Sequence, residues 1–246
     1  MADGERRGPH EGASEADSGQ PAPPARALSG EVTGLEAQVR HPGRVNLYLD
    51  GRFAFGLDAE VAAEVGLRVG DVLSEQGVAE LLQREAQQTA MQQALHLLSY
   101  RPRSEQELRR HLGQKGHAPE TVEAVLSRLR EFHYLDDSVF ALSWVENRQR
   151  FRPRGARLLR AELRQKGVAP EVTEQAIEDA AGDERAMALE AAQRKLAGIR
   201  AADYQTFGRQ LGGFLMRRGF APDVVWEVVR ELWARRSGER APLADE

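Results

Sequence analysis

The chain of 246 residues contains no cysteine. This composition excludes disulfide frameworks, thiolate nucleophiles and thiolate zinc sites, and it fits a reducing cytoplasm. No apolar run approaches the roughly 20 residues needed to cross a bilayer, and the first 27 residues lack the apolar segment of a secretory signal. We therefore expect a soluble cytoplasmic protein with no membrane partner.

Signatures of catalysis are also lacking. The chain has no Walker-type phosphate loop and no Gly-x-Ser-x-Gly motif. Asp136 and Asp137 stand at a predicted helix start, which favours capping over metal binding or acid–base chemistry. The scattered histidines show no metal-ligand spacing: His96, His111, His117 and His133. The sequence predicts a non-enzymatic protein with no cofactor, no metal and no small-molecule substrate.

Acidic residues slightly outnumber basic ones overall, but positive charge is locally concentrated. The formal net charge is -4 and the pI is near 6.0, which at first argues against nucleic acid as a partner. From Ala94 to Lys166, however, 15 Lys and Arg stand against 9 Asp and Glu, a local net charge of +6. Both flanking segments are acidic, so we expect the functional surface in this basic middle.

The pattern of residues at the N-terminal end of the chain predicts a tail followed by a small β-containing domain. Residues 1–29 have too few large apolar side chains to offset chain entropy and are expected to be disordered. Asp50-Gly51 supplies the positive φ angles of a two-residue hairpin turn. Apolar residues alternate with polar ones on both sides of this turn: Val45, Leu47, Leu49, Phe53 and Phe55.

This hairpin needs further partners to be stable. A strand around Leu35 to Arg40 is expected to pair with it. Two helical segments are candidates to cover the sheet, one over Asp58 to Val65 and one that begins after Ser74 and extends to about Ser99.

The rest of the chain is helical in pattern and repeats itself. Three segments share a Leu-x3-Leu-x3-Gly-x2-Pro frame, offset by 51 and 52 residues. Leucines four apart share one helix face, a basic residue then Gly suits a helix C-terminus, and Pro suits the next first turn. Each frame therefore predicts a helix-turn-helix joint. The frames are Leu108, Leu112, Gly116, Pro119; Leu159, Leu163, Gly167, Pro170; and Leu211, Leu215, Gly219, Pro222.

A preceding helix completes each repeat: Gln88 to Ser99, Asp137 to Arg148 and Asp183 to Lys195. Ser104 and Glu107 form a predicted capping box, and Pro153 is expected to start the second helix of repeat two.

The predicted fold class is mainly α: three tandem three-helix repeats in an elongated array, after a small α+β domain and a disordered tail. The boundaries are 1–29 tail, 30–86 N-terminal domain, 87–134, 135–181 and 182–236 repeats, and 237–246 C-terminal tail.

Several segments together resemble the RecX family, in its long form with an extra N-terminal β domain. They span about Glu31 to Trp233 and include the three basic-Gly turns. The others are Leu98 to Ser104, Leu135 to Asp137 with Phe140-Ala141, Trp144-Val145 and Arg148, and, for the β domain, Arg44 to Leu47, Leu49 to Gly51 and Phe53 to Leu57.

The resemblance implies a regulator in DNA repair, homologous recombination and the SOS response. Such a protein binds RecA–DNA filaments and limits filament growth and the recombinase, ATPase and coprotease activities of RecA. Periodicity alone gives only a helical array with extended surfaces, so the RecA filament as partner rests on family analogy.

The candidate contact surface is an arginine run in repeat two. Its charges repel one another, and either an acidic or polyanionic partner or internal ion pairs would relieve the repulsion. Phe151 is open between stacking on a base and packing, whereas the spacing of Phe140 and Trp144 favours packing. The candidate residues are Arg148, Arg150, Arg152, Arg154, Arg157, Arg160, Arg164, Lys166 and Phe151.

Two alternatives remain open. One is a direct, sequence-nonspecific module for single- or double-stranded DNA that acts without RecA, with affinity that falls steeply as salt rises. The other is a hydrolase without a recognisable motif.

Overall fold

The computed structural model describes residues 28–180 and 182–238, and these fall into two compact units divided between Leu82 and Gln83. The tails expected at 1–29 and 237–246 lie outside the described residues, apart from residues 28–29 and 237–238.

The first unit is built on an antiparallel sheet of order β3-β2-β1-β4. The predicted hairpin is confirmed: Asp50 and Gly51 have φ angles of 47° and 77° between β2 and β3. The strand expected at Leu35 to Arg40 begins earlier, because Gly30 pairs with Leu73 of a short strand that carries no periodicity to predict it. The strands are β1 Gly30–Ala37, β2 Arg44–Leu49, β3 Arg52–Asp58 and β4 Val72–Leu73.

Two helices complete the core of this sheet. Helix α1, Ala59–Glu64, starts where the Asp58 carboxylate accepts the Glu60 N–H at 2.8 Å. Helix α2, Glu75–Tyr100, adds Val78 and Leu81 to the buried cluster of the first unit. Its later residues Ala90 and Ala94 belong to the core of the first repeat, in the second unit.

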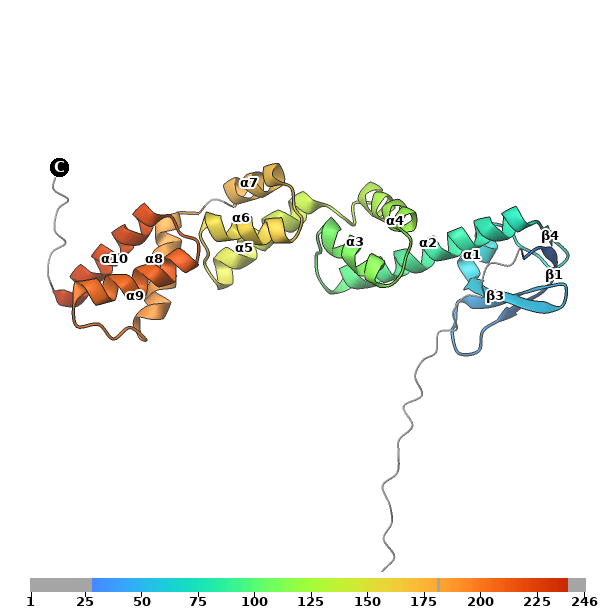
Figure 1. Cartoon of the computed structure of the whole chain (residues 1–246), viewed down its shortest axis with the longest axis horizontal. Helices are drawn as coiled ribbons and strands as arrows, with labels where there is room; N and C mark the ends of the chain where they lie inside the picture. Colours follow the sequence, from blue (N-terminus) through green and yellow to red (C-terminus); the bar gives the residue numbers. More distant parts are fainter. Residues whose placement is uncertain (1–27, 181, 239–246) are drawn as a thin grey trace, which may run out of the picture. The chain divides into compact units, whose positions relative to one another are not determined.

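The second unit contains the three predicted three-helix repeats (Figure 1). Each repeat has its own buried apolar cluster, and both leucines of each frame are at most 2% exposed. None of the described helices has the length and apolar character to span a membrane. Repeat 1 uses the end of α2 with α3 Glu105–Gln114 and α4 Pro119–Glu131; repeat 2 has α5 Asp137–Phe151, α6 Ala156–Gln165 and α7 Pro170–Asp179; repeat 3 has α8 Glu184–Leu196, α9 Tyr204–Arg217 and α10 Pro222–Ser237.

The helix-turn-helix joints have the predicted geometry. Gly116, Gly167 and Gly219 adopt φ angles of 88°, 80° and 86°, and a proline opens the helix that follows each of them. The N–H of the residue after each glycine returns to the carbonyl of the second leucine of the frame. A side chain at these positions would strain the backbone, which is why glycine recurs.

Two local expectations are wrong. Pro153 does not start α6, which begins at Ala156 with Gly155 as its N-cap. The Pro153 carbonyl accepts from Arg218 at 3.3 Å and the Gly155 N–H donates to the Arg218 carbonyl at 2.9 Å, so repeat 3 holds this segment extended.

The capping box is only half formed. Ser104 Oγ accepts the Glu107 N–H at 3.2 Å. The Glu107 carboxylate does not return to Ser104, because it pairs with Arg101 and Lys166.

Candidate partner-binding surface

The arginine run lies on the end of α5, the extended segment 152–155, and α6. Helix α5 ends at Phe151 with Arg152 as its C-cap, and Gly155 opens α6. The cations therefore project from three differently oriented pieces of backbone. Their neighbours decide which of them remain available to a partner.

Glu162 on α6 neutralises part of the run. Its carboxylate, whose side chain is 13% exposed, forms ion pairs with Arg148, at 3.1 Å, and with Arg154. It also accepts the indole N–H of Trp144 at 2.9 Å. Glu162 therefore links the side chains of Trp144, Arg148 and Arg154 within repeat 2.

Two cations lie over the Trp144 ring, and one of them is again Arg148. The Arg148 guanidinium lies 4.1 Å from the ring centroid and Lys166 Nζ lies 4.9 Å from it. Trp144 packs against the core cluster of repeat 2, and Phe140 is buried within that cluster, so the expectation of packing is confirmed for both. Arg148, Arg154 and Lys166 therefore have internal roles.

Arg157 and Arg160 also have partners, on different helices. Arg157 donates to the Met216 carbonyl of α9 at 2.8 Å. Arg160 forms a two-pronged pair with Glu174 of α7 at 2.7 and 2.8 Å, and this hydrogen bonding raises the pKa of Arg160 and lowers that of Glu174. Both arginines lie on α6, but Arg157 contacts α9 whereas Arg160 contacts α7.

The remaining members of the run face outward. Arg150, Arg152 and Arg164 are exposed, and none of them forms an ion pair with a described residue. Phe151 is 59% exposed, and the Arg150 guanidinium lies 5.4 Å from its ring centroid. These four side chains form the outward part of the predicted surface.

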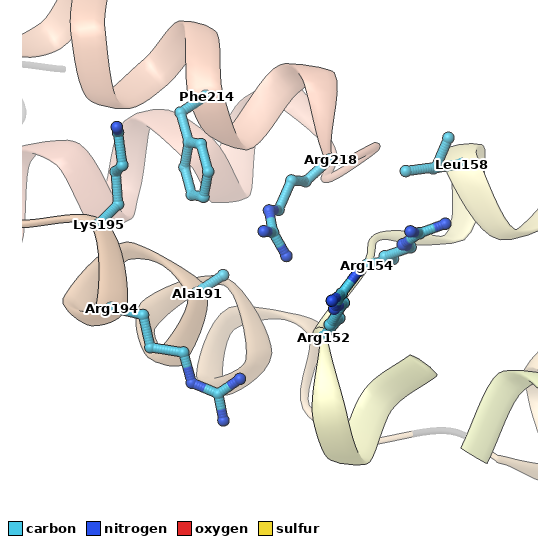
Figure 2. Close-up of a pocket in the computed structure, with 8 residues that line it drawn as sticks. All are labelled: Arg152, Arg154, Leu158, Ala191, Arg194, Lys195, Phe214 and Arg218. Atoms are coloured by element: carbon cyan, nitrogen blue, oxygen red, sulfur yellow. The ribbon is translucent and has the colours of Figure 1, made fainter. Parts of the chain in front are cut away.

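A cleft of about 580 Å³ brings Arg152 and Arg154 together with cations that the sequence does not point to (Figure 2). Arg194 and Lys195 come from the end of α8, and Arg218 is the C-cap of α9. These residues are 40 or more positions from Arg154 in the sequence, so no local pattern connects them. The lining residues are Arg152, Arg154, Leu158, Ala191, Arg194, Lys195, Phe214 and Arg218.

The cleft lies where repeats 2 and 3 meet, and this contact has a counterpart between repeats 1 and 2. In the first contact Ser104 Oγ donates to the Lys166 carbonyl at 2.6 Å. In the second the Gly155 N–H donates to the Arg218 carbonyl at 2.9 Å. In both cases the start of the second helix of one repeat receives the Lys/Arg-Gly turn of the next. We call these contacts the first and second junction.

Asp136 and Asp137 cap helices, as expected, but they cap two different ones. Asp136 accepts the Ser138 and Val139 N–H groups of its own helix at 2.7 and 3.2 Å. Asp137 accepts the Glu105 N–H of α3 at 2.9 Å and so adds to the first junction. Burial is the main cause that raises the pKa of Asp137. Within the described residues no three His, Asp or Glu side chains gather as metal ligands would.

Family models match in order along the chain. The regulatory protein RecX N-terminal domain matches residues 30–74. The first, second and third three-helix domains of RecX match residues 90–129, 136–177 and 183–229. The last three matches fall on the three repeats.

Curated relatives match over about four fifths of this chain. A regulatory protein RecX of Bacillus licheniformis is 30% identical over 201 residues, which cover 81% of this chain and 76% of the relative. One from Clostridium botulinum is 28% identical over 204 residues, which cover 82% of this chain and 95% of the relative.

Solved structures share the architecture. A crystal structure of regulatory protein RecX has a TM-score of 0.65 and 26% identity, and the match covers 83% of this chain and all of that one. The RecX structure from Lactobacillus salivarius, at 18% identity and a TM-score of 0.55, supports the fold alone. With four family models in order and a 30% identical relative covered over 76% of its length, the chain belongs to the RecX family of regulatory proteins.

Proposed function

We propose that this protein is a non-enzymatic, mainly inhibitory regulator of RecA that acts in the cytoplasm on RecA–DNA filaments. It would modulate the recombinase, ATPase and coprotease activities of RecA. The observation that carries the proposal is the ordered match of four RecX domain models over the N-terminal domain and all three repeats. Relatives named regulatory protein RecX support it.

The outward part of the arginine run supplies a contact surface of suitable chemistry. Arg150, Arg152 and Arg164 are exposed cations with no ion pair to a described residue, and Phe151 places an exposed ring beside Arg150. Clustered positive charge attracts DNA phosphates or an acidic protein surface, and either would relieve the mutual repulsion. We propose these four residues as direct contacts.

The other five predicted residues are held by contacts within the protein, either inside repeat 2 or with the neighbouring repeats. Their substitution would remove ion pairs or hydrogen bonds within the protein as well as any contact with a partner. They are therefore poor first choices for testing the surface. They are Arg148, Arg154, Arg157, Arg160 and Lys166.

The test measures RecA's DNA-dependent ATPase and strand exchange with and without stoichiometric protein. We expect clear inhibition by the natural sequence. The triple variant Arg150→Glu, Arg152→Glu, Arg164→Glu should inhibit much less. The matched control reverses three exposed arginines of repeat 3, Arg200, Arg209 and Arg230, and should inhibit normally.

The outcomes separate the function from the surface. If the natural sequence leaves both RecA activities unchanged, the proposed function is wrong. If the triple variant inhibits as well as the control variant, only the surface assignment is wrong. A gel shift on bare DNA at physiological salt, without any effect on RecA, would replace the proposal by a direct DNA-binding role.

A further inference from the structure

The two junctions share a sequence element, Arg-Pro-Arg. It occurs at 101–103, before α3, and at 152–154, before α6. The separation of 51 residues equals the offset between the first two repeat frames. The same three residues therefore precede the same helix in the same kind of contact, and the two sites can be compared position by position.

At the first junction one carboxylate neutralises cations from both repeats. Glu107 accepts from Arg101 Nη1 at 3.0 Å and from Arg101 Nη2 at 3.3 Å. It also pairs with Lys166, which comes from the turn of repeat 2. The Glu107 side chain is only 12% exposed, so the protein holds its own anion in place between two cations.

At the second junction the cations recur but the carboxylate does not. Leu158 stands 51 residues after Glu107, and Arg218 stands 52 residues after Lys166. Arg218 donates to the Pro153 carbonyl and lies 4.8 Å from the Phe214 ring centroid, with no described acidic partner. Arg152, the counterpart of Arg101, also has no ion pair to a described residue.

The cleft collects still more positive charge around Leu158, which stands where a carboxylate would be. Lys195 contributes a cation without a described acidic partner, while Arg154 and Arg194 are paired with Glu162 and Glu190, which do not line the cleft. No acidic residue lines the cleft among the described residues. Burial, followed by the charges of Arg152 and Arg194, lowers the pKa of Arg218. Arginine nevertheless stays protonated in proteins, so the repulsion persists until an anion arrives.

We propose that the cleft at the second junction binds a phosphate group, which takes the place that the Glu107 carboxylate takes at the first junction. Three cations without acidic partners exceed what one carboxylate offsets at the first junction, and a phosphate offers more acceptor oxygens for forked guanidinium groups. The source is a nucleic-acid strand or a free nucleotide. The inference does not rest on the proposed action on RecA.

The test is calorimetric titration of the full chain, without RecA, using three probes. They are a short single-stranded oligonucleotide, inorganic pyrophosphate, and a polyglutamate peptide with the charge of the oligonucleotide. We expect phosphate binding that weakens with salt. Binding of the oligonucleotide alone identifies a strand as the source, and binding of both phosphate probes identifies any accessible phosphate, including that of a nucleotide.

The decisive variant is Leu158→Glu, which places a carboxylate where Glu107 stands in the first junction. It should weaken phosphate binding by about tenfold or more, because an internal anion competes for the same charge-assisted contacts. Gln165→Glu adds the same charge at the exposed end of α6, outside the cleft, and should bind normally.

A second cleft variant with its own control tests the proposal in case Leu158→Glu does not fold. The double variant Arg152→Gln, Lys195→Gln changes only exposed side chains of the cleft and should also lose about tenfold in affinity or more. Arg209→Gln, Arg230→Gln is its control. The proposal is overturned if neither phosphate probe binds, if the cleft variants bind as well as their controls, or if polyglutamate binds as tightly as the oligonucleotide.

Discussion

Both junctions bring the start of a second helix against the Lys/Arg-Gly turn of the next repeat, but they do so with different chemistry. At the first, side chains make the contact: Ser104 donates to the Lys166 carbonyl, Asp137 caps α3, and Glu107 holds two cations. At the second, glycine takes the place of serine and the backbone approaches directly. A Cβ on Gly155 would overlap the Gly219 carbonyl.

This difference separates stability from binding. A junction with a largely shielded, paired carboxylate is electrostatically complete and has no unpaired cation to offer a ligand. A junction in which leucine replaces that carboxylate keeps its cations and stays intact through close backbone packing and hydrogen bonds. Repetition of a structural unit thus allows one copy to serve the fold and another to acquire a site.

The largest loss of stability should come from placing serine, which stands at position 104 in the first junction, at the equivalent Gly155 of the second. Gly155→Ser should lower the free energy of unfolding by roughly 3 kcal/mol, because the new side chain has only backbone to displace. Chemical denaturation followed by circular dichroism measures it. Ser104→Gly, the reverse exchange, should cost about 1 kcal/mol, because Ser104 Oγ no longer donates to the Lys166 carbonyl or accepts the Glu107 N–H. Equal costs would contradict the difference in packing.

Neutralising the carboxylate of the first junction should have the next largest effect. Glu107→Gln leaves Arg101 and Lys166 without their anion and should cost about 1 to 2 kcal/mol. The exposed Glu131, changed in the same way, is the control. If both variants unfold at the same denaturant concentration, the carboxylate does not hold the junction together.

The same carboxylate predicts a pH dependence. Burial by itself raises the pKa of Glu107, but hydrogen bonds and charges from Arg101 and Lys166 lower it below its usual value. Its contribution is therefore complete above the unfolded-state pKa of about 4.3 and is lost as the pH falls through the lower folded-state value. Thermal unfolding between neutral and acidic pH should show a smaller loss for Glu107→Gln than for the natural sequence.

Removing the second cap of α3 should have a moderate effect. Asp137→Ala leaves the Glu105 N–H without its acceptor and should cost about 1 kcal/mol. Asp137→Asn keeps an acceptor oxygen and removes a charge that burial disfavours, so it should cost less. Denaturant midpoints compare the two, and an Asn variant as unstable as the Ala variant would argue against a capping role.

The smallest effect should come from the surface pair of repeat 2. Arg160→Gln breaks a two-pronged contact with Glu174, but both side chains are 48% exposed. Solvent screening should limit the cost to about 0.5 kcal/mol, and the cost should become smaller still as the salt concentration rises. A loss as large as that of Glu107→Gln would show that exposure does not distinguish the two pairs.

The features that the sequence predicts well are those set by neighbouring residues. The Asp50-Gly51 turn and the three Lys/Arg-Gly turns need positive φ angles, and glycine signals them directly. Leucines four apart likewise predict the buried face of each second helix. The start of α6 does not follow this logic, because contacts from repeat 3 hold Pro153 to Gly155 extended.

The candidate site is predicted only in part. The sequence identifies repeat 2 as the basic part of the chain and leaves contact with a partner and internal ion pairing open for the whole run, whereas Glu162 and Glu174 in fact pair with Arg148, Arg154 and Arg160. Arg-Pro-Arg recurs before α3 and α6, but the sequence alone does not connect this repetition with a cleft. Its value appears only when the two junctions are compared.

The sequence by itself determined the three joints, the hairpin and the basic character of the middle repeat, because backbone preference and apolar spacing act within a few residues. Only the tertiary structure decided which cations are neutralised. Glu107 contacts Lys166 although 59 positions separate them in the sequence, and Arg218 contacts Pro153 across 65 positions. Electrostatic pairing depends on distance in space, so the fold had to form before one junction could be complete and the other open.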